Sequence, residues 1–125
     1  MGGSEGSGGS GVCEGRPRWL RLRIYIGESD RYHGKPLYMH ILHVLKKSGV
    51  RGATVYRGIA GYGSHSMIHT VNLLRLSEDL PIVIESVDEE ERIERVLPLI
   101  EELVEEGLVT IDPVRLVYYG HKRKK

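Results

Sequence analysis

A glycine- and histidine-rich stretch holds the residue types in this sequence that are best suited to chemistry. Its glycines are Gly58, Gly61 and Gly63, and two histidines, His65 and His69, follow them. Glycines allow backbone N–H groups to approach a ligand and to form a nest that binds an anion, although a turn that needs positive φ angles has the same composition. A pair of histidines is a weak sign of a metal without a third ligand. The residues alone therefore leave three interpretations open: a phosphate cradle, a metal site, or a flexible turn.

The glycine spacing does not match the two nucleotide-binding motifs of defined geometry. A Walker phosphate loop requires a lysine directly after its last glycine, where this chain has Ser64. A dinucleotide fingerprint requires a third glycine where the chain has Ser66, and no doubly wound βαβ unit surrounds the stretch. The loop therefore lacks a motif that would by itself identify its ligand.

A polar stretch, Gly27–Lys35, supplies the second group of candidate residues. It carries Glu28 and Asp30, which could act as a carboxylate pair, and Lys35, which could bind an anion. The stretch precedes a predicted helix N-terminus, where anions are favourable. No nucleophile lies at an identifiable spacing from these carboxylates, so an acid-rich turn is the simpler interpretation. We expect a protein that is not an enzyme.

A second pair of histidines, His40 and His43, lies three residues apart on a predicted helix and off its apolar stripe. Solvent-exposed histidines explain this pair as well as a metal does, because no further ligands accompany it. The chain has one cysteine, Cys13, and no His-Glu-x-x-His motif. The residues therefore predict neither a disulfide nor an assigned metal ligand.

The first half of the chain predicts a strand, a helix and a second strand. The segment Trp19–Gly27 alternates apolar and polar residues, as a strand with one buried face does. A helix is predicted from Pro36 in its first turn to Gly49 beyond its end. Segment 53–58 reads as the second strand. The apolar stripe of the helix consists of Leu37, Tyr38, Ile41, Leu42 and Leu45.

The second half of the chain repeats this order. Segment 80–87 is apolar on both faces, which predicts a third strand at the centre of the sheet. Asp88 is expected to cap a second helix, with Glu91 at the capping-box position, and Pro98 predicts a kink in that helix. Gly107 is expected to end it, before one or two final strands in segments 108–111 and 114–119.

Two strand-helix-strand units in succession predict an α+β fold of the ferredoxin-like (βαββαβ) type. Its antiparallel sheet would have both helices on one face. The other face, which would carry Arg21, Arg23 and Tyr25, would have no helix and is expected to bind a ligand or another subunit. We expect residues 1–18 to be a disordered glycine- and serine-rich segment, 19–120 to be the folded domain and 121–125 to be a basic tail.

The composition restricts the class of protein. The formal net charge is +1, but segment 88–106 carries nine acids and two arginines, a net charge of −7. No stretch reaches the roughly 18 apolar residues of a membrane span, and the N-terminal segment has no apolar core of the kind found in secretory signals. The chain has no phenylalanine, and its inner strands lack the aromatic pattern of RNA-binding ferredoxin-like domains. We expect a cytoplasmic protein without a nucleic-acid partner.

Four blocks of the sequence are similar to one known family. They are GESDRYHGKPLY, GATVYRGIAGYGSHSMIHT, LSEDLPIVIESVD and GLVTIDPVRLVYY, which lie between Gly27 and Tyr119. Together they resemble the family called domain of unknown function one-ninety. That family is in turn similar to the PII signal-protein superfamily.

The resemblance implies a homotrimer in which a long loop, here Arg57 to about Asp79, contacts a membrane or enzyme protein partner. In PII-like proteins the base of this loop lines a cleft between subunits that binds adenine nucleotides. PII proteins also carry a glycine-rich basic loop after the second helix, where this chain has only an acidic turn at 105–108.

The resulting hypothesis is a non-enzymatic PII-like regulator that binds a small anionic ligand, such as an adenine nucleotide. The expected binding residues are Arg57, Gly58, Gly61, Gly63, His65, His69, Glu28 and Lys35. The alternative is a metal-responsive trimer of the CutA type that uses its histidines.

Overall fold

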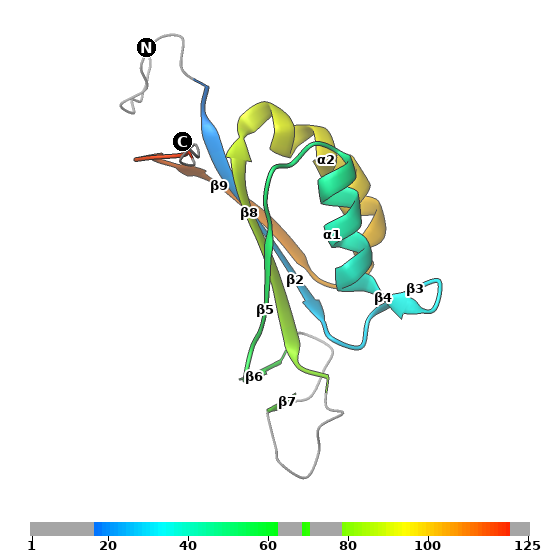
Figure 1. The fold of residues 1–125 in the computed structure, drawn as a ribbon. Coiled ribbons are helices and arrows are strands. Elements are labelled where there is room, and N and C mark those ends of the chain that lie inside the picture. Colours follow the sequence, from blue (N-terminus) through cyan, green and yellow to red (C-terminus); the bar gives the residue numbers. More distant parts are fainter. Residues whose placement is uncertain (1–16, 63–68, 71–78, 121–125) are drawn as a thin grey trace, which may run out of the picture.

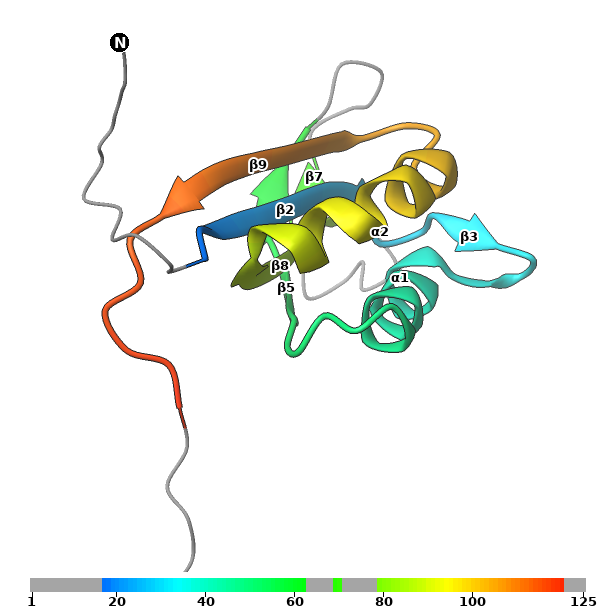
Figure 2. The same cartoon turned by 90° about the horizontal axis from the view of Figure 1, so that it is seen from above.

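The computed structural model describes residues 17–62, 69–70 and 79–120. Four antiparallel strands form the main sheet, and two helices cover one face of it (Figures 1 and 2). In sheet order the strands are β5 (Thr54–Arg57), β8 (Pro81–Glu89), β2 (Trp19–Gly27) and β9 (Leu108–Val114). The helices are α1 (Leu37–Lys47) and α2 (Glu90–Leu103). This arrangement is the ferredoxin-like fold that the order of elements predicts.

Strand β2 occupies the predicted residues and has the two predicted faces. Leu22 and Ile24 are completely buried, because their side chains point toward the helices. Arg21 and Arg23 are half-buried and Tyr25 is exposed on the opposite face. The alternation of apolar and polar residues in the sequence therefore predicts correctly which side chains of this strand are buried.

Helix α1 begins and ends as predicted. Pro36 is its N-cap, a position at which a missing N–H costs nothing. Gly49 follows the C-cap residue with a φ of 99°, a left-handed conformation that favours glycine. A short hairpin of β3 (Arg31–Tyr32) and β4 (Lys35–Pro36) precedes the helix.

The connection between β5 and β8 has short described segments, 60–61 and 69–70, that lie beyond the end of the main sheet (Figure 1). It contains a second small ladder of β6 (Ala60–Gly61) and β7 (His69–Thr70), in which Gly61 is paired with His69. The predicted site residues Gly63 and His65 lie outside the described residues.

Helix α2 does not begin with the predicted cap. Its N-cap is Glu89, which makes no side-chain capping hydrogen bond. Asp88 is instead a β8 residue with the same parity as Ile82 and Ile84, so its side chain points toward the core and is fully buried. The capping-box prediction was wrong because β8 runs two residues beyond Val87. Pro98 lies inside α2 as expected.

A single strand, β9, ends the sheet. It covers the first predicted segment and reaches Val114, but residues 115–120 form no strand and leave the sheet (Figure 2). Of the one or two final strands expected, the described residues thus contain one. Gly107, just before β9, does not cap α2, which ends at Leu103. A Cβ at Gly107 would overlap the carbonyl oxygen of Tyr25, so a close approach to β2 requires glycine there.

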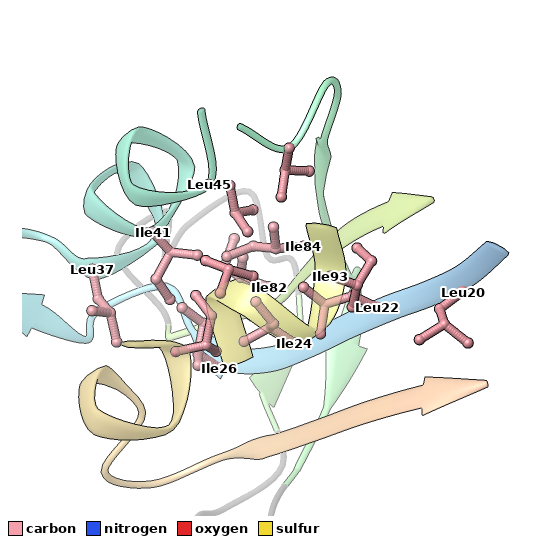
Figure 3. Close-up of a cluster of buried hydrophobic side chains, with 13 residues drawn as sticks. Leu20, Leu22, Ile24, Ile26, Leu37, Ile41, Leu45, Ile82, Ile84 and Ile93 are labelled. Atoms are coloured by element: carbon pink, nitrogen blue, oxygen red, sulfur yellow. The ribbon is translucent and has the colours of Figure 1, made fainter. Parts of the chain in front are cut away.

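The hydrophobic core lies between the sheet and the two helices (Figure 3). Aliphatic side chains from β2 and β8 meet Ile41 and Leu45 of α1 and Ile93, Val96 and Ile100 of α2. Among the described residues, no helix covers the opposite face of the sheet (Figure 2). Neither helix in the described part of the chain is long and apolar enough to cross a membrane.

Candidate functional site

A groove of about 530 Å³ lies where the start of β5 meets the end of β8. Pairing of Thr54 with Glu85 and of Tyr56 with Val83 places these residues on the sheet face that has no helix. The residues that line the groove are Arg51, Gly52, Ala53, Thr54, Tyr56, Glu85, Ser86, Val87 and Tyr119. The groove thus combines a strand edge, two tyrosines, a carboxylate and a guanidinium.

Two hydrogen bonds connect residues that line the groove. The Tyr56 hydroxyl donates a hydrogen bond to the Glu85 carboxylate. This bond, followed by loss of solvent, raises the pKa of Tyr56. The Ser86 hydroxyl donates to the Gly52 carbonyl oxygen at 2.5 Å and holds the segment before β5 against β8.

The side chain of Arg51 is held in place by the buried carboxylate of Asp88. Its guanidinium Nη2 lies 2.6 Å from Asp88 Oδ1, and its backbone N–H donates to Asp88 Oδ2 at 2.8 Å. The Asp88 side chain is 1% exposed, whereas that of Arg51 is 32% exposed. Burial alone would raise the pKa of Asp88, but the hydrogen bonds from Arg51 and from the Glu89 N–H outweigh burial and lower it.

The exposed side of Arg51 contacts two aromatic rings, one at the start of β2 and one in the segment that follows β9. The guanidinium carbon lies 5.3 Å from the ring centre of Trp19 and 5.0 Å from that of Tyr119. The two rings are themselves 5.2 Å apart and tilted by 50°. These distances are typical of cation–π and aromatic contacts. Tyr119 is thereby held at the groove although it belongs to no strand.

The predicted loop-base residues form a different cluster. Arg57 is paired with Glu28 at 2.8 Å, which joins the end of β5 to the turn after β2. The Gly58 N–H donates to the Pro81 carbonyl oxygen at 2.7 Å, so this N–H is not free for a phosphate. A Cβ at Gly58 or at Gly61 would lie 2.9 Å from Pro81 Cγ. Both glycines therefore allow the loop to pack against Pro81.

The remaining predicted site residues are not gathered around one point. Lys35 is exposed in β4, within the hairpin before α1. His69 is placed by its backbone in β7, opposite Gly61. The structure thus brings together Arg57 and Glu28, and Gly61 and His69, but it keeps Lys35 on a separate element.

The turn after β2 is an ordered acidic turn. The Gly27 N–H donates to Asp30 Oδ2 at 3.1 Å, and the Ser29 N–H donates to Asp79 Oδ1 at 2.8 Å. Burial raises the pKa of Asp30, the Gly27 hydrogen bond opposes this effect, and the negative charges of Asp79 and Glu106 add to it. Asp30 thus has a structural partner in this turn.

The histidines of α1 do not form a ligand set. His40 stacks on Tyr32 with ring centres 4.0 Å apart, and His33 contacts the same tyrosine at 4.3 Å. Within the described residues, no group of three or more histidine, cysteine or acidic side chains is arranged to hold a metal.

Sequence reasoning missed Arg51, Asp88 and Tyr119 as parts of one cluster. One signal was available: Asp88 has the core-facing parity of Ile82 and Ile84, and a carboxylate at such a position needs a cationic partner. Nothing in the sequence indicated that the partner would be Arg51, which is 37 residues away.

The open face of the sheet, which is the face opposite the two helices, carries ion pairs between neighbouring strands. Arg21 is bound to Asp112 at 2.8 Å across β2 and β9, and Arg23 lies 3.6 Å from Glu85 across β2 and β8. Apolar side chains of Val83 and Leu108 lie beside them, at positions paired with Tyr25. The open face therefore presents both charged and apolar side chains.

Comparison with known proteins relates the chain to one family. The model of the DUF190 family, described as Uncharacterized ACR, matches residues 19–116. A UPF0166 protein of Methanocaldococcus jannaschii is 46% identical over 100 residues, which are 79% of this chain and 91% of the relative. A UPF0166 protein of Aquifex aeolicus is 42% identical over 97 residues, which are 78% of this chain and 91% of the relative.

Solved structures with the same fold are PII-like. One is CPII, a nitrogen regulatory PII-like protein from Thiomonas intermedia bound to ADP, AMP and bicarbonate. It has a TM-score of 0.61 and 21% identity, and the match covers 79% of this chain and 88% of that one. Another, from Thermus thermophilus, is described as a PII-like signaling protein; its TM-score is 0.55 at 19% identity, over 79% of this chain and 90% of that one. This likeness confirms the PII-like fold.

Proposed function

The chain belongs to the DUF190 family, and we propose that it is a non-enzymatic PII-like regulator that binds an adenine nucleotide. The observation that carries this proposal is the groove between β5 and β8. CPII, which shares the fold, was solved with ADP and AMP bound, and this supports the choice of ligand.

The chemistry of the groove suits a planar base. Two tyrosines, Tyr56 and Tyr119, supply aromatic surface for stacking. The Glu85 carboxylate is an acceptor for an exocyclic amino group. In the main sheet β5 pairs only with β8, so its outer edge offers backbone donors and acceptors beside the groove. The groove thus combines two aromatic rings with charged and hydroxyl groups that could fix the orientation of a ligand.

The loop-base residues would contact the same ligand from a second copy of the chain. Within one chain, Tyr56 lies on the open face, whereas the neighbouring Arg57 is paired with the core-side residue Ile82 and reaches Glu28. One copy therefore does not direct both groups at one ligand. In a homotrimer, Arg57 and the glycine loop of one subunit would face the groove of the next and supply positive charge for the phosphates.

The output of binding would be a change in the loop between Arg57 and Asp79. A ligand held at the base of this loop would bias its conformation, as in disorder-to-order switches. The loop would then present an altered surface to a membrane or enzyme protein partner. The predicted residues Gly63, His65 and His69 would take part through this loop.

Thermal unfolding of the full chain with AMP, ADP, ATP and cyclic AMP tests the proposal. A ligand that binds only the folded state raises the unfolding temperature in proportion to the logarithm of its concentration once it exceeds the Kd. Replacing Gly61 and Gly63 with valine should weaken this effect, and because a Cβ at Gly61 would lie 2.9 Å from Pro81 Cγ, the unfolding temperature without ligand measures any loss of stability separately. Absence of stabilisation by all four nucleotides would refute nucleotide binding.

Sedimentation velocity tests the homotrimer separately. The open face, with Val83, Tyr25 and Leu108, would lie at the subunit contacts. Leu108→Arg should therefore shift the trimer toward monomer, because an arginine there would be desolvated without a partner. Lys47→Ala, a change on the exposed side of α1, should leave the trimer intact. A wild-type chain that sediments as a monomer would contradict the intersubunit site.

A further inference from the structure

Among the described residues that follow β9, Tyr119 is the one that lines the groove. It reaches the groove because Arg51 lies 5.0 Å from its ring centre, and Trp19 lies 5.2 Å from it. Tyr119 is nevertheless 53% exposed. One part of its surface is therefore in contact with the Arg51–Trp19 pair, and a large part remains open.

We propose that Tyr119 determines the specificity of the groove for ligands with a planar base, and that ligand binding in turn fixes the segment Arg115–Gly120 on the fold. The inference rests on the proposed function, because it concerns the ligand of the same groove. The open surface of Tyr119 stacks on the base. The bound base then adds a second contact that keeps Tyr119 against Arg51.

Arg51 acts as the positioning residue for this tyrosine. Its guanidinium is fixed by Asp88, with contacts of 2.6 and 3.1 Å to Oδ1. A planar group held in this way can accept an aromatic ring on its face while its N–H groups stay paired in the plane. Lysine at this position would keep the charge, but it would lose the planar surface and the paired donors.

Because linked equilibria are reciprocal, the inference can be tested both by the affinity for the ligand and by the docking of the C-terminal segment. If the ligand holds the C-terminal segment in place, then the segment must raise the affinity for the ligand by the same factor. Trp19 is the single tryptophan of the chain, and it does not line the groove. Its emission therefore reports the docking of Tyr119 rather than direct contact with the ligand.

The experiment measures ADP binding by calorimetry and Trp19 emission in the wild-type chain, Tyr119→Ala, Tyr119→Phe and Tyr118→Ala. Tyr119→Ala should weaken ADP binding by about 5- to 100-fold, the range for loss of one stacked base. Tyr119→Phe should bind as the wild type does, because the ring is kept. Tyr118→Ala is the matched control, since Tyr118 is 73% exposed and lines no part of the groove.

Emission should change in step with binding. In the free protein, Tyr119→Ala should shift Trp19 emission to longer wavelength. Trp19 is 9% exposed in the wild type, and removal of the Tyr119 ring would expose it further to solvent. In the wild-type chain, ADP should alter the emission with the Kd found by calorimetry. In Tyr119→Ala, saturating ADP should leave it unchanged.

The outcomes separate the inference from the proposed function. Unchanged or tighter ADP binding by Tyr119→Ala would overturn the inference and leave the nucleotide site standing. A loss of affinity in Tyr119→Phe equal to that in Tyr119→Ala would also overturn it, since the hydroxyl would then be the contact. Absence of ADP binding by the wild-type chain would remove the proposed function itself.

Discussion

The guanidinium of Arg51 and the carboxylate of Asp88 form an ion pair that links the groove to the core. Their closest atoms are 2.6 Å apart, and the Asp88 side chain is 1% exposed. Asp88 ends a core-facing row of β8, and Arg51 lies just before β5. One ion pair thus couples the packing of the sheet to the surface on which Trp19 and Tyr119 meet.

Removal of either partner should destabilise the fold, and by different amounts. Arg51→Ala removes the closer of two cations at a buried carboxylate and leaves only Arg92, 3.8 Å away, so we expect a loss of up to about 3–5 kcal/mol, the value for comparable pairs. Asp88→Asn leaves a cation that is 32% exposed and can be solvated, so we expect a loss of about 1.5–3 kcal/mol. Urea unfolding at one protein concentration measures both values. Equal losses, or losses below about 0.5 kcal/mol, would contradict the assigned role of this pair.

The carboxylates of Asp88 and Asp30 should respond to pH with opposite signs. The pKa of Asp88 is lowered in the fold, so its contribution is complete above the unfolded value of about 3.9 and is lost as the pH falls through the folded value. The pKa of Asp30 is raised, so its ionised form is a penalty near neutral pH, which is relieved as the pH falls through its folded value.

Substitution separates these two contributions. At pH 7, Asp88→Asn should lower the unfolding temperature, whereas Asp30→Asn should leave it unchanged or raise it. The difference between the wild type and Asp88→Asn should hold from pH 7 down to about pH 4 and should shrink as the pH falls further. Unfolding temperatures measured across this range check both signs, and a marked loss of stability in Asp30→Asn at pH 7 would be inconsistent with the raised pKa.

Gly107 should be intolerant of even one methyl group. A Cβ there would overlap the Tyr25 carbonyl oxygen and would lie 3.0 Å from Val104 Cγ1. The backbone of β2 cannot move away without breaking its pairing with β9, so Gly107→Ala should cost about 2 kcal/mol or more. Gly52→Ala is the matched control, because a Cβ at Gly52 would have no atom within 4 Å of it. Chemical denaturation measures the free energy of unfolding of both variants, and similar values for the two would refute the prediction.

The Arg57–Glu28 pair should matter for binding more than for stability. The Arg57 side chain is 55% exposed, and an exposed pair contributes less than about 1 kcal/mol. If Arg57 supplies charge to the phosphates, Arg57→Ala should weaken ADP binding by roughly ten-fold, since a hydrogen bond to a charged group contributes about 1.5–3 kcal/mol. Lys47→Ala provides the control for loss of one positive charge. Calorimetry in parallel with thermal unfolding measures both effects, and equal ADP affinity in the two variants would exclude Arg57 from the site.

The strands and helices of the ferredoxin-like fold could be predicted from the sequence because their signals are local. The alternation in Trp19–Gly27 and the Pro36 and Gly49 boundaries each depend on a few neighbouring residues. The role of Asp88 could not be predicted in this way. Its position suggests a helix cap, and only the register of β8 and the distant Arg51 assign it to the core.

The candidate groove could not be predicted from the sequence, since it depends on contacts between distant segments. Of the residues that the glycine loop pointed to, Gly58 and Gly61 pack against Pro81, and Arg57 is bound to Glu28. The groove, however, is made by β8, by the segment before β5 and by Tyr119, which no single motif connects. The sequence pattern of segment 114–119 predicts a strand, and a strand would not have brought Tyr119 to Arg51.

Calorimetric titration of ADP into the full chain and into Ala53→Trp tests the central claim most directly. Ala53 lines the groove and is exposed, so an indole at this position should fill the groove without disturbing the core. Lys47→Trp, on the exposed side of α1, is the control for an added indole. We expect saturable binding to the wild type and to Lys47→Trp, and binding at least roughly ten times weaker to Ala53→Trp. Equal binding by all three proteins would place the nucleotide elsewhere, and absence of binding to the wild type would contradict the account as a whole.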